Sequence, residues 1–291
     1  MGQPVSTEEI FSRIDVTPPY YALRDVTRND DGTVEASASR IQDLGQQVGP
    51  ITAADAARHM AIMGSVGAGL DNPEPDRHMY LAYDAEFRRA RERPPEDATE
   101  FRLSARHTWI NAGTAQSTIV LRTDDGAPIN SLSVYYMVLK RDDFFFFFGD
   151  NQRETDESTD PYADAVGLSD VEIEGKILRA TLGEITPELC PGHFKGLPAM
   201  PVAYLMSNVL DANATLLKSV LNADTLSFAV REGSVRAEAL AFVGERVDVE
   251  VEFQRFSGGT YWLHSKALVG NEKSVGALHT KLRVREQPSI R

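Results

Sequence analysis

Two long apolar segments at a fixed separation constrain this chain more than any other feature. Residues 53–70 and 201–220 are rich in Ala, Met, Leu, Val and Gly around much of a helical circumference, which predicts two buried helices. The residues that introduce the two segments lie 148 positions apart. Thr52 is placed to cap the first helix, and Pro201 suits the first turn of the second. The chain is therefore expected to contain two copies of one unit, each built around a central helix.

The strand pattern repeats at nearly the same offset. Alternating apolar residues at 101–105 recur at 249–253, and with the offset relaxed to 146 the last strands of the two halves also coincide. A further strand candidate precedes each helix, near 32–41 and 171–185. Each half should consist of a strand, a long helix and about four strands in a meander.

This pattern predicts an α+β protein with two antiparallel sheets, each wrapped around a long central helix. It resembles the hotdog fold, and two copies in one chain resemble a double hotdog. The expected organisation is an N-terminal leader at 1–20, a first hotdog repeat at 21–149, an acidic linker at 150–166 and a second repeat at 167–291. Within the leader, Ser6 and the glutamate three residues later suit a capping box for a short helix.

The segment from Pro187 to Pro201 carries a motif. It resembles the β-hydroxyacyl-ACP dehydratase signature G-H-F-P-G-x-P-x-M-P-G over about twenty residues. Lys195 stands where the signature has a proline, and Val202 replaces its final glycine. The matching positions are Gly192, His193, Phe194, Gly196, Pro198, Met200 and Pro201.

The resemblance implies roles for these residues. His193 would be the general base that takes the C2 proton of a 3-hydroxyacyl thioester, while a carboxylate on the other repeat's helix protonates the departing hydroxyl. Backbone N–H groups at the helix start, near Val202, would polarise the thioester carbonyl. The family's carboxylate lies 14 residues after the histidine, and this position here is Ser207. The substrate-binding residues expected from the motif and this helix position are Gly192, Phe194, Gly196, Met200, Val202 and Ser207.

At an offset of 148, the counterpart of Ser207 in the first half is His59. Because hotdog sites form across the two-fold axis, His193 is expected to face His59 and Asp55, four residues earlier. We hypothesise that Asp55 keeps His59 protonated, so that His59 replaces the missing acid. The alternative is a buried structural histidine bonded to Asp55. The reciprocal site, Ser207 with the loop at 45–48, lacks a histidine and should be degenerate.

Composition narrows the function classes. The formal net charge of −13 disfavours a nucleic-acid partner. A single cysteine, Cys190, excludes a disulfide framework and fits a reducing cytoplasm. No apolar run approaches a membrane span, and no metal, nucleotide or serine-hydrolase motif is present. A cytoplasmic protein with no cofactor and no membrane partner is therefore expected.

Several other residues allow both a functional and a structural interpretation. The basic cluster Arg88, Arg89, Arg91 and Arg93 suits docking of an acidic carrier protein or coenzyme A, or else a solvated strand end. Residues 144–148, five phenylalanines, could line an acyl tunnel or close the core of the first repeat as alternating strand residues. Cys190, Asn208 and Asp211 are interpreted in the same two ways, with packing favoured for Cys190.

Three functional hypotheses remain open. The first is a 3-hydroxyacyl-ACP or -CoA dehydratase, or hydratase, of fatty-acid or polyketide-type metabolism, with His193 as base. The second is a hotdog thioesterase using Asp55 or Asp211 to activate water, or an acyltransferase of related layout. The third is a non-catalytic acyl-carrier binding module. Because the duplication builds in the family's usual dimer, a monomer should suffice, and a homodimer remains possible.

Overall fold

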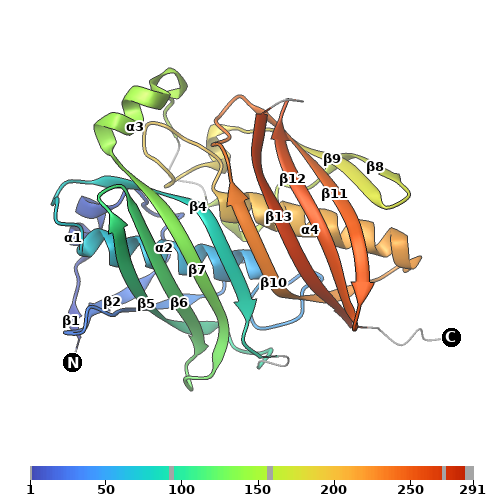
Figure 1. The fold of residues 1–291 in the computed structure, drawn as a ribbon, viewed down its shortest axis with the longest axis horizontal. Helices are drawn as coiled ribbons and strands as arrows, with labels where there is room; N and C mark the ends of the chain where they lie inside the picture. Colours follow the sequence, from blue (N-terminus) through green and yellow to red (C-terminus); the bar gives the residue numbers. More distant parts are fainter. Residues whose placement is uncertain (1, 92–94, 156–159, 271–272, 286–291) are drawn as a thin grey trace.

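The computed structural model describes residues 2–91, 95–155, 160–270 and 273–285 (Figure 1). Each half of the chain places two strands before a long helix and four strands after it. The first half contains β2 (Arg24–Arg28), β3 (Val34–Ser39), α2 (Ala53–Leu70), β4 (His78–Arg89), β5 (Glu100–Asn111), β6 (Thr114–Thr123) and β7 (Pro128–Lys140). The second half contains β8 (Ser169–Glu174), β9 (Ile177–Glu184), α4 (Val202–Leu221), β10 (Ser227–Ala237), β11 (Arg246–Ser257), β12 (Thr260–Val269) and β13 (Lys273–Arg285).

The two central helices match the sequence prediction closely. All but one of the 18 residues of α2 are buried, as expected for a helix that is apolar around its circumference. Thr52 caps α2 by accepting a hydrogen bond from the backbone N–H of Asp55 at 3.1 Å. Pro201 precedes α4 but supplies no side-chain cap. Each helix packs against its own half of the sheet, and the two helices also contact each other.

The two expected sheets are joined edge to edge. Strands β4 and β10 pair antiparallel, with Glu232 opposite Arg88, and this pairing makes one sheet of 13 strands among the described residues. The strand order is β1-β2-β3-β5-β6-β7-β4-β10-β13-β12-β11-β9-β8. In Figure 1, α2 lies behind the first half of this sheet and α4 behind the second. The alternation predicted at 101–105 and 249–253 holds, because the inward side chains of both segments are buried.

Two sequence predictions need refinement. The strand candidate at 171–185 is a hairpin, β8 and β9, that turns at Gly175. The phenylalanines at 144–148 do not continue β7 as alternating strand residues; they form the helix α3 (Arg141–Phe148). A helix distributes five consecutive rings over its whole circumference, so Phe144 is fully buried while Phe146 and Phe147 are exposed.

The segment before the first repeat folds onto the rest of the molecule. It contains β1 (Gln3–Pro4), which pairs with β2, and α1 (Thr7–Arg13), which Ser6 caps as predicted. Short 3-10 turns follow at 149–151 and 161–163, and another, 187–189, precedes the motif. Arg93 and residues 156–159 of the expected linker lie outside the described residues. The four domain boundaries stay predictions. No described helix has the length and apolar character needed to cross a membrane.

Candidate functional site

The loop that carries the motif is fixed by glycines and by the segment before β2. Gly192 has a φ of +74°, and a Cβ there would lie 2.2 Å from the carbonyl oxygen of Thr17. The same glycine accepts a hydrogen bond through its carbonyl from the Thr17 N–H at 2.9 Å. A backbone bridge joins Val16 to His193. Any side chain at position 192 would therefore collide with the backbone, so glycine there allows the loop to place His193 at this point.

The orientation of His193 determines its protonation state. Its Nδ1 lies 2.8 Å from the carbonyl oxygen of Ala199. A carbonyl can only accept, so Nδ1 carries the proton and Nε2 keeps its lone pair. Burial lowers the pKa of His193 to about 4, because the charged form is poorly solvated there. At neutral pH His193 is an uncharged imidazole with a basic Nε2.

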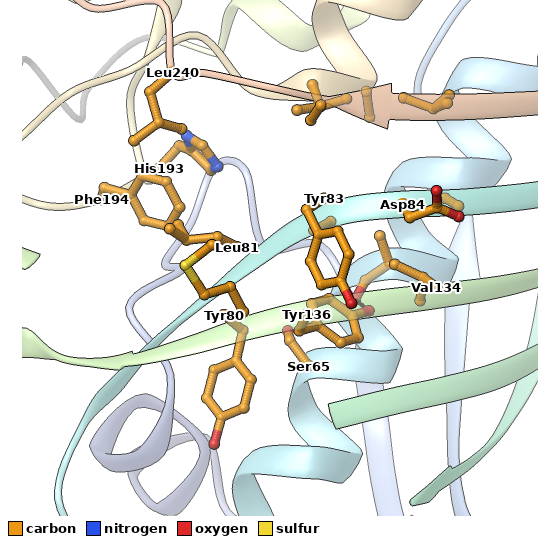
Figure 2. Close-up of a pocket in the computed structure, with 18 of the residues that line it drawn as sticks. Ser65, Tyr80, Leu81, Tyr83, Asp84, Val134, Tyr136, His193, Phe194 and Leu240 are labelled. Carbon is orange, nitrogen blue, oxygen red and sulfur yellow. Dashed lines mark hydrogen bonds between the residues drawn. The ribbon is translucent and has the colours of Figure 1, made fainter. Parts of the chain in front are cut away.

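His193 lines a cavity of about 460 Å³ between the two halves of the molecule. The walls come from α2, β4, β7, α3, α4 and the end of β10. In Figure 2, His193 and Phe194 lie at one end beside Leu240, whereas Asp84 lies toward the other. Most of the lining is apolar, including Ala57, Ala61, Ile62, Leu81, Leu132, Val134, Leu139, Phe148, Phe194, Val202, Ala203, Met206 and Phe242. A cavity of this composition suits a hydrocarbon chain.

The N-terminus of α4 opens onto this cavity. Its first two residues, Val202 and Ala203, line the cavity, and no side chain caps the helix. The first N–H groups of a helix have no partner within it, so these donors are left for a ligand oxygen. The N-terminus of α2 differs, because Thr52 and Gln47 accept hydrogen bonds from its N–H groups. Of the two pseudo-equivalent helix starts, the one beside His193 is open.

The structure does not bring His193 and His59 together at the cavity. Ala57 and Ala61 line it, whereas Asp55 and His59 lie two positions earlier on α2, about 200° around the helix. His59 Nε2 contacts Asp55 Oδ1 at 3.3 Å and the Ser39 carbonyl oxygen at 3.0 Å. The expected Asp55–His59 contact is present, on the face of α2 that points away from the cavity.

Burial also lowers the pKa of His59, and this effect outweighs the attraction of Asp55. The hypothesis that Asp55 keeps His59 protonated is therefore not supported by the environment of the ring. Asp55 instead accepts hydrogen bonds from the backbone N–H groups of Ile41 and Gln42 through Oδ2, at 2.8 and 3.3 Å. These contacts give Asp55 a structural role at the backbone of residues 41–42, while the bond to His59 that the structural alternative expected is only a 3.3 Å ion-pair contact.

The helices start 149 residues apart, one more than the offset read from the sequence, because α2 begins at Ala53 and α4 at Val202. The counterpart of Ser207 is then Arg58. Arg58 is buried, and its guanidinium donates to the carbonyl oxygens of Pro19 and Tyr20. The position at which the resembling family has an acid thus holds a cation in this chain.

The reciprocal arrangement brings Ser207 to the loop of the first half. Ser207 Oγ lies 3.5 Å from Gln42 Oε1, which also accepts from Thr52. The helix of the second half therefore meets the first half at Gln42, just before the loop at 45–48 that was expected to face Ser207. This second position has no histidine, and the side chains there, Gln42, Thr52 and Ser207, contact one another.

The other residues expected to bind substrate have different surroundings. Phe194 and Val202 line the cavity. Gly196 has a φ of +86° and approaches the ring of Phe145, which keeps the loop against α3. Met200 is buried, and its N–H donates to the Ala241 carbonyl at 2.8 Å. These contacts fix the conformation of the loop, and Gly192, Gly196 and Met200 do not line the cavity.

Sequence reasoning missed Tyr20, a neighbour of His193, and Arg58, which holds Tyr20. Tyr20 lines the cavity with its ring centroid 5.0 Å from that of His193, and Arg58 stacks over Tyr20 at 4.9 Å. Tyr20 lies in the segment treated as a leader, and nothing in its local sequence connects it with a motif more than 170 residues later. The register error of one residue concealed Arg58.

The remaining candidates have structural surroundings. Cys190 is fully buried, and burial raises its pKa to about 12, so it is not an activated thiol. Asn208 bonds to Gly167 and Tyr204. Burial raises the pKa of Asp211. Arg89 donates to the backbone of Val48. The described residues contain no group of three or more His, Cys, Asp or Glu side chains placed to hold a metal ion.

Comparison with solved structures confirms the fold. The chain is similar to a hotdog-fold protein of unknown function from Alicyclobacillus acidocaldarius, with a TM-score of 0.56 and 12% identity over 94% of this chain and 100% of that one. It is also similar to a 12:0-ACP thioesterase from Umbellularia californica (TM-score 0.57, 9% identity, 92% and 100% covered). A third similar structure is an acyl-CoA thioesterase II from Mycobacterium marinum (TM-score 0.54, 11% identity, 92% and 97% covered).

No protein-family model matches the sequence, and no curated protein sequence matches it. The chain has the tandem hotdog architecture that the repeat predicted. At these identities the similarity establishes the fold alone.

Proposed function

We propose that this double hotdog is an enzyme acting on acyl thioesters, with His193 as its general base. One observation carries the proposal: a neutral imidazole with a free Nε2 lies on the same apolar cavity as the uncapped N-terminus of α4. The thioester carbonyl would accept hydrogen bonds from the Val202 and Ala203 N–H groups, and the acyl chain would fill the cavity. The similar structures named as thioesterases support the substrate class.

The reaction we favour is reversible dehydration of a 3-hydroxyacyl thioester. His193 Nε2 takes a proton from C2, the C2–C3 double bond forms, and the C3–O bond breaks as the hydroxyl leaves with a donated proton. The helix N–H groups stabilise the negative charge that develops on the carbonyl oxygen. A base with a pKa of about 4 is weak for this proton, so the enolate must draw much of its stability from these donors.

Hydrolysis to the free acid is the second candidate. Two acidic side chains, Asp84 and Glu238, line the cavity, and either could activate a water molecule. In Figure 2, Asp84 lies toward the end of the cavity away from His193, so a hydrolytic site based on Asp84 would not use the motif. Dehydration should therefore depend on His193, whereas hydrolysis at this second position should depend on Asp84.

Mass spectrometry of intact substrates distinguishes them. Purified protein is incubated with 3-hydroxyacyl, 2-enoyl and saturated acyl thioesters of coenzyme A and of an acyl carrier protein. His193→Ala and Asp84→Asn are assayed beside the wild type. Loss or gain of one water that disappears in His193→Ala supports the dehydratase or hydratase.

Other outcomes assign other functions. Free acid that depends on Asp84 supports the thioesterase. Binding of an acyl-pantetheine analogue without turnover of any thioester contradicts the enzyme proposal and favours the binding module. Transfer of the acyl group to an added alcohol supports acyl transfer.

A further inference from the structure

Elimination of a hydroxyl group needs a proton donor near the base, and the α2 position that the resemblance assigns to this donor holds Arg58. His59 and Asp55, the substitutes expected from the sequence, point away from the cavity. Another polar side chain near His193 must therefore supply this proton. This inference rests on the proposed dehydration.

Tyr20 is the polar side chain that contacts the His193 ring from within the cavity wall. Its ring centroid lies 5.0 Å from that of His193, with an interplanar angle of 71°. Arg58 donates its hydrogen bonds to the backbone carbonyl of Tyr20, and the phenol hydroxyl takes no part in them. Burial raises the pKa of Tyr20 to about 12, so the phenol remains protonated at neutral pH.

Three of the other hydroxyl groups that line the cavity have partners. Tyr136 donates to the Ala61 carbonyl at 2.6 Å, and Ser65 donates to the Ile62 carbonyl at 2.8 Å. Tyr80 accepts a hydrogen bond from Asn72 at 3.1 Å. Tyr83 lies apart from His193 in Figure 2. None of these four shares the direct ring contact that Tyr20 makes with His193.

Arg58 holds the N-terminal segment that contains Pro19 and Tyr20 in the site. Its guanidinium donates to the Pro19 carbonyl at 2.7 Å and twice to the Tyr20 carbonyl, at 2.7 and 3.0 Å. It also lies over the rings of Tyr20 and Tyr162, at 4.9 and 4.6 Å from their centroids. The Tyr162 hydroxyl donates to the carbonyl of Pro191, two residues before His193. One buried cation thus connects Tyr20 to the motif loop.

We propose that the Tyr20 hydroxyl is the catalytic proton donor to the departing 3-hydroxyl group, and that Arg58 is a positioning residue that holds Tyr20 beside His193. The Tyr20 O–H bond breaks as its proton joins the leaving hydroxyl, which departs as water. The electron pair of the C2–H bond becomes the C2–C3 double bond. The proton taken by His193 then returns to the Tyr20 oxygen and restores both groups. In hydration, each transfer runs in reverse.

The test separates proton abstraction from elimination. Tyr20→Phe removes the hydroxyl and keeps the ring against Arg58 and His193. Each variant is incubated in D₂O with a 3-hydroxyacyl thioester, and mass spectrometry follows both deuterium uptake at C2 and loss of water. Tyr21→Phe is the matched control, because Tyr21 is buried against Phe11, outside the cavity. His193→Ala identifies the signal that depends on the base.

We expect Tyr20→Phe to lose water at least about 100-fold more slowly than the wild type while still exchanging the C2 proton. Tyr21→Phe should behave as the wild type, and His193→Ala should lose both signals. Elimination by Tyr20→Phe within about threefold of the wild type would overturn the assignment and leave the dehydratase intact. A wild type that neither exchanges C2 nor loses water would overturn the dehydratase as well.

Arg58→Lys tests the positioning role. Lysine keeps the charge but cannot reproduce the fork of three hydrogen bonds. We expect slower elimination, with KM little changed and C2 exchange retained in the folded variant. A parallel loss of C2 exchange and elimination would indicate that the whole loop is disturbed and would contradict a specific action through Tyr20.

Discussion

A single hydrogen bond determines what His193 can do. Because Nδ1 donates to the Ala199 carbonyl, the ring presents an unprotonated Nε2, and burial keeps the imidazole neutral. The same burial at His59 gives a neutral ring with a different set of partners, Ser39 and Asp55. Burial lowers the pKa of both histidines, and the two rings differ in what they face: His193 faces the cavity, and His59 faces Ser39 and Asp55.

The pH dependence of the reaction should report the pKa of His193. The base is active when deprotonated, so kcat/KM should stay level from about pH 8 to about pH 5 and fall as the pH approaches the folded pKa of about 4. An ordinary histidine would cause the decline near about pH 6.5 instead. Steady-state rates across this range, with circular dichroism to verify folding, provide the measurement. A decline near neutral pH would contradict the buried, uncharged His193.

Substitution of His59 should affect stability more than turnover. His59→Leu leaves the Ser39 carbonyl without its His59 donor and removes the contact with Asp55, which should cost about 1–3 kcal/mol of unfolding free energy. His59→Gln retains an N–H donor and should cost less. Denaturant titration measures both, and rates are expressed per folded molecule. A large fall in turnover with unchanged stability would restore the catalytic interpretation of His59.

At the scale of elements, α3 links the cavity to the motif loop. Phe144 is fully buried, and its ring centroid lies 5.2 Å from that of Phe194 in the motif. Phe147 and Phe148 line the cavity, so the expectation of an acyl-lining role for these rings stays open. Phe146 is 84% exposed on the other side of the helix.

The two faces of α3 should respond differently to truncation. Phe144→Ala removes a buried ring and should cost about 3–5 kcal/mol, with lower activity because Phe194 loses its support. Phe146→Ala is the matched control on the same helix and should change stability by less than about 0.5 kcal/mol. Thermal unfolding and turnover are measured for both. Equal effects would mean that α3 does not pack as described.

For the whole molecule, the pairing of β4 with β10 makes the two repeats one sheet, and the cavity lies against this junction. The cavity takes walls from both α2 and α4, so neither repeat encloses it alone. His193 comes from the second repeat and Tyr20 from the segment before the first. The candidate site is therefore assembled from both halves.

The continuous sheet predicts cooperative unfolding. The chain has two tryptophans, Trp109 in β5 of the first half and Trp262 in β12 of the second. Variants Trp109→Phe and Trp262→Phe each leave one reporter, so fluorescence follows one half at a time. We expect coincident denaturant midpoints, after correction for the stability change of each substitution by circular dichroism. Two separated transitions would show that the halves unfold independently.

The sequence by itself determined the architecture. Helix circumference and strand alternation are local patterns, so two buried helices, their meanders and the motif before Val202 could be located without coordinates. The motif also made His193 the candidate base, because its glycines and prolines specify a loop conformation at fixed spacing.

Only the tertiary structure decided which residues meet His193. A shift of one residue in the aligned offset exchanges His59 for Arg58 and turns a helix position by about 100°, which gives the side chain a different set of neighbours. Tyr20 reaches the site through hydrogen bonds to Arg58 that no local pattern encodes. Periodicity fixes which face of an element is buried, but the partner of each buried side chain depends on how distant segments pack.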